Sequence, residues 1–140
     1  MPTSSLLRIS DAASLGLHAV VVLAGADGEL ISTESIATKM GMSSNHLAKV
    51  LQRLSRAGLV EAVRGPHGGF RLGQPAENIR LMDVYEAIEG PVRPGHCILG
   101  QPMCGRKRCI MGNLVETVQE RFIDYFSKTS LADLVETEDE

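Results

Sequence analysis

The sequence predicts a mainly α fold with a small β-hairpin, in which a winged helix-turn-helix domain precedes a long C-terminal helix. Three observations predict it. Two short helical segments meet at a glycine, two short β-prone segments follow around a glycine-rich loop, and an apolar stripe of helical period runs through residues 110–126. With 140 residues, of which 44% are hydrophobic, the chain suffices for one domain, or for a small domain with an appendage.

Two helices are expected in the first forty residues. Asp11 can cap a first helix that ends near Gly25, where a Gly-Ala-Asp-Gly turn begins. Ser32 or Thr33 starts a second, shorter helix, and Gly41 ends it in the role of a residue with positive φ.

The third predicted helix has two distinct faces. Ser43 caps it and Gly58 stops it. Its apolar residues recur with the spacing i, i+3, i+4, i+7, namely Leu47, Val50, Leu51 and Leu54. The other face combines side chains that read base edges with cations that bind phosphates: Ser44, Asn45, His46, Lys49, Gln52, Arg53 and Arg56. A solvated amphipathic helix would show the same pattern, so this face alone does not establish DNA binding.

A hairpin follows the third helix. Its strands, residues 59–63 and 69–72, flank a loop in which Pro66 and several glycines exclude a helix. Arg64 and His67 lie on this wing, where they can reach phosphates or a minor groove. Because an ordinary hairpin manages with two turn residues, the small residues of this longer loop favour a close approach to a phosphate backbone.

These elements divide the chain into four parts. The winged helix-turn-helix domain spans residues 1–90 and ends in a fourth helix near 82–88. A loop rich in proline and glycine, residues 91–109, carries the three cysteines. The apolar stripe predicts one long helix over 110–135, and an acidic tail, residues 136–140, follows it.

The net charge of −3 argues against a general nucleic-acid binder, but it conceals an uneven distribution. Residues 43–72 carry five basic side chains and a single acidic one, whereas the last ten residues carry five acidic side chains and no basic one. The predicted DNA-binding face is therefore positive. No apolar run approaches the roughly 18 residues that a membrane span needs. The N-terminus lacks the pattern of a signal peptide, so we expect a cytoplasmic protein with no membrane partner.

The three cysteines predict a site for sulfur chemistry. Their odd number excludes a fully paired set of disulfides within one chain. Cations at residues 106–108 and the start of a helix both favour thiolates, and with them reactive or metal-bound sulfur. The spacing is not the paired C-x2-C pattern of structural zinc, while iron–sulfur clusters accept thiolates from loosely spaced loops. Three incidental loop thiols are the alternative.

The segment 63–72, VRGPHGGFRL, resembles the wing signature of the Rrf-two family of bacterial regulators. The segments 79–90 and 129–135 and the cysteine loop match the same family, in one order over about residues 6–135. The resemblance implies a dimeric transcription factor. In it the C-terminal helix pairs two subunits, and the first helix of one subunit approaches the cysteine loop of the other. The resemblance also implies an iron–sulfur cluster, 2Fe–2S or 4Fe–4S, whose ligands are Cys97, Cys104 and Cys109.

The fourth ligand of the implied cluster stays open. Some members have a histidine three residues after the last cysteine, where this chain has Gly112. Others have an acidic residue in the first helix, where this chain has Ser14. Asp11 lies one turn before that position and His18 one turn after it, so both are candidates. His96 adjoins a cysteine and would be strained as a ligand of the same iron. The middle cysteine also comes one residue later than the family spacing.

Together, these features predict a dimeric transcriptional repressor that binds a palindromic operator in double-stranded DNA. It would sense redox state, nitric oxide or iron–sulfur status through the cluster. The alternative is a regulator without a cluster, whose cysteines form a thiol–disulfide switch or bind zinc. An enzyme is not expected, because the sequence lacks a C-x-x-C pair, a phosphate-binding glycine loop and a Ser/His/Asp constellation. The DNA contacts are expected from Ser43, Ser44, Asn45 and His46 at the start of the third helix, and from Lys49, Arg53, Arg64 and His67 toward the backbone or a groove.

Overall fold

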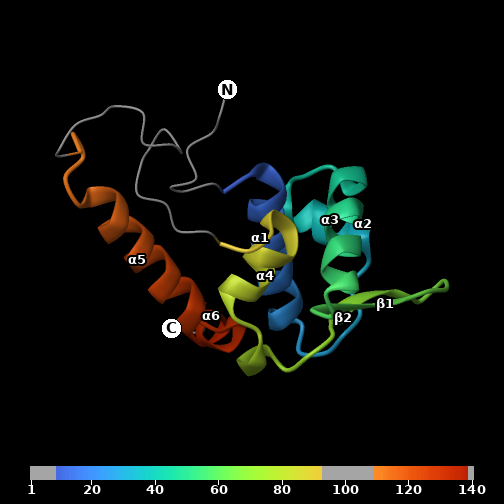
Figure 1. Cartoon of the computed structure of the whole chain (residues 1–140). Helices are drawn as coiled ribbons and strands as arrows, with labels where there is room; N and C mark the ends of the chain where they lie inside the picture. The colour runs from blue at the N-terminus through green and yellow to red at the C-terminus, as the bar shows by residue number, and fades with distance from the viewer. Residues whose placement is uncertain (1–8, 93–108, 139–140) are drawn as a thin grey trace.

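The computed structural model of the chain describes residues 9–92 and 109–138 (Figure 1). Its helices are α1 (Asp11–Gly25), α2 (Thr33–Met40), α3 (Ser44–Arg56), α4 (Leu81–Glu89), α5 (Leu114–Lys128) and α6 (Leu131–Glu138). The strands β1 (Val60–Val63) and β2 (Gly69–Leu72) form an antiparallel hairpin, and the short 3-10 helix η1 (Ala76–Asn78) leads into α4. This mainly helical architecture with a hairpin confirms the predicted fold class. Within the described ranges, no helix is long and apolar enough to cross a membrane.

The helix boundaries follow local capping signals, with one correction. Ser10, and not Asp11, caps α1, because its Oγ accepts a hydrogen bond of 3.1 Å from the backbone N–H of Ala13. Asp11 is the first helical residue, where its carboxylate faces the positive end of the helix dipole. Ser32 caps α2 as predicted, and Gly41 ends that helix with a φ of 66°.

The hairpin is joined to the segment that precedes α2. Its register pairs Val60 with Leu72 and Val63 with Gly69. Ile31 exchanges two backbone hydrogen bonds with Phe70 on β2, at 2.9 and 2.8 Å. The wing is therefore held against the helix-turn-helix at a second point, in addition to its covalent connection to α3.

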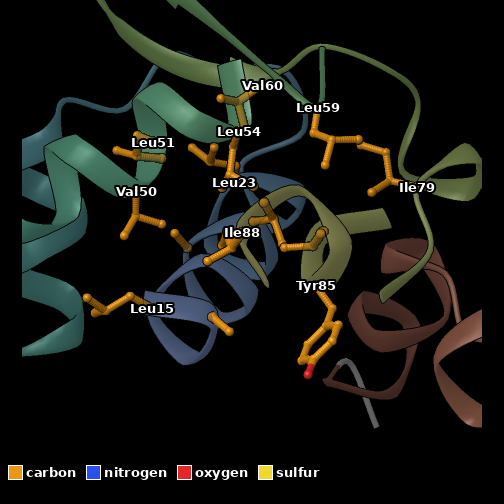
Figure 2. Close-up of a cluster of buried hydrophobic side chains, with 14 of the residues drawn as sticks. Leu15, Leu23, Val50, Leu51, Leu54, Leu59, Val60, Ile79, Tyr85 and Ile88 are labelled. Carbon is orange, nitrogen blue, oxygen red and sulfur yellow. The ribbon is translucent and has the colours of Figure 1, made fainter. Parts of the chain in front are cut away.

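The hydrophobic core forms around α1, which packs on α3, α4 and α6 (Figure 2). The four apolar residues predicted for α3 are all buried. Gly16 of α1 makes room for Ile88 of α4, because a Cβ at this glycine would overlap with the Ile88 Cδ1 atom and lie 3.3 Å from Val50 Cγ1. The close packing at this point joins α1, α3 and α4 into one body, which presents the polar face of α3 outward.

The C-terminal part differs from the single helix predicted over 110–135. Helix α5 ends at Lys128 and α6 begins at Leu131, so the chain turns at Thr129 and Ser130. Ser130 starts a new helix by a reciprocal cap, in which its backbone N–H donates to Asp133 at 2.9 Å and its Oγ accepts from the Asp133 N–H at 3.2 Å. It also forms a β-bridge with Arg80, which no periodicity could indicate. Helix α6 reaches residue 138, so it includes the first residues of the segment predicted as an acidic tail.

The apolar stripe of α5 divides between two faces. Phe122 and Phe126 stack at 4.2 Å between ring centroids, and both meet the ring of Tyr85 on α4 edge to face. Leu114 and Tyr125 are 50% and 55% exposed. One face of α5 therefore docks on α4, while another leaves large apolar side chains in solvent.

Candidate nucleic-acid interface and cysteine segment

The start of α3 presents its polar side chains away from the core. Asn45, His46 and Lys49 are exposed, and Ser44 is half-buried. Ser43 occupies the N-cap position, but its side chain makes no capping hydrogen bond. The first turns of α3 therefore bring an amide, an imidazole, two hydroxyls and an ammonium to one surface, which is the arrangement that a recognition helix needs in a major groove.

Arg53, assigned to DNA by sequence, has a partner within the protein. Its Nη1 donates a hydrogen bond of 3.2 Å to the carbonyl oxygen of Ile88. This carbonyl belongs to the last turn of α4, where backbone oxygens lack helical partners and the helix dipole is negative. Arg53 therefore links α3 to α4, whatever else it contacts.

A groove of about 720 Å³, lined by both polar and apolar residues, separates α3 from the wing. The second half of α3 forms one wall with Gln52, Ser55 and Arg56, and Arg64 lies on the wing opposite. Ser32 and Thr33 at the N-terminus of α2 also line the groove, and a helix N-terminus is favourable for an anion. Sequence reasoning placed Gln52 and Arg56 on this face without including them in the site. Gln52 and Arg56 follow Lys49 by three and seven residues. This helical spacing places them on the same face as Lys49 and could have identified them as site residues.

Glycines at the tip of the wing have a structural role. Gly69 has a φ of 155°, and a Cβ there would lie 2.6 Å from the carbonyl oxygen of Ile31. A Cβ at Gly68 would overlap with the carbonyl oxygen of Val63. The hairpin therefore requires glycine at both positions for its own backbone geometry. This is a second reason for the glycines, besides the close approach to a phosphate backbone that the sequence indicated. Arg64 and His67 are exposed in the same loop.

One cation of the positive region is paired on the hairpin. Arg71 Nε donates to Glu61 Oε2 at 2.9 Å, across the strand register. The hydrogen bond and charge of Arg71 lower the pKa of Glu61, and Glu61 raises that of Arg71. This ion pair makes Arg71 less suited to phosphate binding than Arg64.

Of the three cysteines, Cys97 and Cys104 lie outside the described residues, as do His96 and the cations at 106–108. Cys109 is half-buried, and its Sγ accepts a hydrogen bond of 3.4 Å from the backbone N–H of Met111. Within residues 9–92 and 109–138, no three His, Cys, Asp or Glu side chains gather as a metal site.

The candidate fourth ligands share one groove. Asp11, Ser14 and His18 line a depression of about 480 Å³ together with apolar side chains of α1 and with Lys39, Met40 and Met42 at the end of α2. His18 Nδ1 lies 2.7 Å from the carbonyl oxygen of Ser14. The sequence therefore identified three residues on one accessible face of α1, and their relation to the cysteine ligands stays a prediction.

The family model of Rrf2, described as an iron-dependent transcriptional regulator, matches residues 9–137. CymR, the global cysteine regulator of B. subtilis, is 26% identical with a TM-score of 0.78, over 94% of this chain and 98% of that chain. IscR of T. potens is 25% identical with a TM-score of 0.72, over 94% and 88%. The oxidized form of Staphylococcus aureus CymR is 30% identical with a TM-score of 0.72, over 93% and 97%. Because the family model spans nearly the whole chain and the fold agrees, the chain belongs to the Rrf2 family, whose members are DNA-binding transcriptional regulators and not enzymes.

Proposed function

We propose that the chain is a homodimeric repressor that binds a palindromic operator in the cytoplasm and senses redox state, nitric oxide or iron–sulfur status through a cysteine-bound cluster. One observation carries the proposal. The recognition surface of α3 belongs to the same packed body as α4, whose carboxyl end leads into the cysteine segment. A change at the cysteines would thereby act on the helix that reads DNA.

In the proposed complex, the start of α3 enters the major groove. Asn45 is suited to the N6 and N7 atoms of an adenine, and His46 and Ser44 to neighbouring base edges. Lys49 and Arg64 would bind phosphates on either side. The groove between α3 and the wing, lined by Arg56 and Arg64, would receive the backbone of one DNA strand.

The DNA-binding part is tested by selection from a random duplex pool, followed by fluorescence anisotropy. The selected sequences should carry two half-sites related by a two-fold axis. Asn45→Ala should reduce the ratio of specific to non-specific affinity by about tenfold, the effect of losing one base contact. Glu77→Ala, at an exposed position on η1, is the control. A selected site without two-fold symmetry would contradict the dimeric mode.

The proposed dimer rests on the exposed apolar face of α5. Leu114 and Tyr125 are eleven residues apart and so lie on one side of the helix. Ile110, just before α5, is 73% exposed. A second copy of the chain would cover this face, since exposed apolar patches of this kind mark interaction surfaces.

The described cysteine fits a ligand of an iron–sulfur cluster. A backbone N–H that points at a sulfur, as that of Met111 does at Cys109, stabilises a thiolate and tunes a bound cluster. Such a cluster would supply reversible one-electron chemistry and reactivity with oxygen and nitric oxide. Cys97, Cys104 and Cys109 would hold it, and Asp11 or His18 of a second subunit would complete the ligand set.

Anaerobic purification with quantitation of iron and sulfide tests the cluster. The wild-type protein should be coloured and contain both elements, and exposure to oxygen or nitric oxide should change its affinity for the operator. Cys104→Ser should lose the iron and the response, whereas Ser14→Ala should keep both. If Cys104→Ser retains full iron and an unchanged response, the cluster proposal fails.

A second candidate is a cluster-free regulator in which the cysteines form a thiol–disulfide switch or bind zinc. The 30% identity to a CymR that was solved in an oxidized form favours it. An iron-free protein whose operator affinity follows a thiol oxidant would support the disulfide form. Stoichiometric zinc in the isolated protein would support the other.

A further inference from the structure

The carboxyl end of α4 is held by two helices, α1 and α3, whose contacts converge on the adjacent residues Ile88 and Glu89. The backbone of Ile88 accepts the hydrogen bond from Arg53 of α3. Its side chain lies over Gly16 of α1, where Val50 of α3 also approaches. Glu89 accepts a hydrogen bond from Ser10, the residue that caps α1. Gly90, with a φ of 87°, then ends the helix.

The bond between Arg53 and Ile88 spans 35 residues and joins two surfaces of different function. At one end lies the recognition helix, four residues beyond Lys49. At the other end lies the last turn of α4, two residues before Gly90 and nine before the first cysteine. A guanidinium at a helix C-terminus is favourable, because it satisfies a free carbonyl and opposes the negative end of the dipole.

We propose that Arg53 is a positioning residue, which sets the angle of α3 by holding it to the carboxyl end of α4, and is not a phosphate ligand. This inference rests on the proposed role of α3 in reading DNA. Arg53 is exposed, but its Nη1 donates to a backbone oxygen that cannot move without moving α4. Arg56, one turn later and in the groove that faces the wing, is the cation suited to the phosphate.

A positioning residue and a phosphate ligand should affect the salt dependence of operator binding differently. Each phosphate contact contributes about one unit to the slope of log affinity against log salt concentration. Arg53→Met keeps the aliphatic stem and removes every donor. We expect it to weaken operator binding about tenfold, the cost of a charge-assisted hydrogen bond, with an unchanged slope. Arg56→Met should reduce the slope by about one and serves as the matched control on the same helix.

A second measurement needs no DNA. In the free protein, Arg53→Met should speed amide hydrogen exchange in the last turn of α4, at residues 88–90, while Arg56→Met leaves it at the wild-type rate. A slope that falls by about one in Arg53→Met, or exchange at residues 88–90 that matches the wild type, would overturn the inference. If the wild-type chain binds no specific DNA, the proposed function fails, but the exchange experiment still decides whether Arg53 holds α4.

Discussion

Arg80 donates a hydrogen bond of 3.0 Å from its Nη1 to the carbonyl oxygen of Lys128, 48 residues later in the chain. Arg80 is the N-cap of α4 and Lys128 is the last residue of α5, so one side chain joins the start of one helix to the end of another. Two backbone hydrogen bonds, Leu81 N–H to Thr129 and Leu131 N–H to Ile79, lie beside it at 3.0 Å each.

Arg80→Met should loosen this junction. The lost hydrogen bond satisfies a carbonyl at the end of α5, so we expect a loss of about 1 kcal/mol in the free energy of unfolding. Urea denaturation followed by circular dichroism measures the change. Arg64→Met, at an exposed position on the wing, should have almost no effect. Equal stability of the two variants would show that the junction is held by its backbone bonds alone.

Stability should depend on pH through Asp133. The backbone N–H and the hydroxyl of Ser130 hold its pKa below the ordinary aspartate value, and Arg80 adds a smaller effect in the same direction. Because the folded-state pKa is lowered, the stabilisation is present in full above the unfolded pKa, about 4, and is lost as the pH falls through the folded value. Asp133→Asn should be less stable than the wild type at pH 7, and the difference should disappear in acid. If Asp133→Asn is still less stable than the wild type at low pH, the loss of stability comes from packing and not from the charge of Asp133.

Gly69→Ala should disrupt the wing. A side chain there meets the carbonyl oxygen of Ile31 at 2.6 Å and must adopt a φ near 155°. We expect a loss of at least about 1–2 kcal/mol in stability, the cost of a non-glycine residue in such a conformation. Gly65→Ala, also at positive φ but with open space around it, separates the backbone cost from the collision. Thermal unfolding compares them, and an equal cost in both would remove the collision as the cause.

Arg64→Ala should weaken operator binding and reduce the salt slope by about one, because one phosphate contact is lost. Arg71→Ala is the matched control on the same hairpin, since Arg71 is already paired with Glu61. Fluorescence anisotropy from low to moderate salt measures both. Identical slopes for Arg64→Ala and the wild type would exclude the wing as a phosphate contact.

Leu114→Asp together with Tyr125→Asp should convert the proposed dimer to a monomer, because each subunit would bury two charges in an apolar interface. Light scattering after size-exclusion chromatography measures the mass, and circular dichroism verifies that the helices are intact. Glu120→Lys changes the charge on a different side of α5 and should leave the dimer unchanged. A double variant that stays dimeric would place the interface elsewhere.

The winged helix-turn-helix was predictable because its signals are local. Ser32, Gly41 and the apolar spacing of α3 act within one or two turns of the chain, and the structure agrees with them. The break between α5 and α6 was missed, because the predicted helix was extended to residue 135, beyond the end of the apolar stripe at residue 126. It depends on Ser130, which pairs with Arg80 from the other end of the fold.

The same distinction applies to the candidate site. By itself the sequence determined which residues face outward on α3, that the wing needs glycines, and that three cysteines follow the domain. Only the tertiary structure decided that Arg53 bonds to Ile88, that Arg56 and Arg64 face one groove, and that Asp11 and His18 share another. The physical reason is that capping and periodicity depend on neighbours along the chain. The partner of a long side chain depends instead on which helices pack side by side. Here the close packing of Gly16 against Ile88 brings α4 within reach of Arg53.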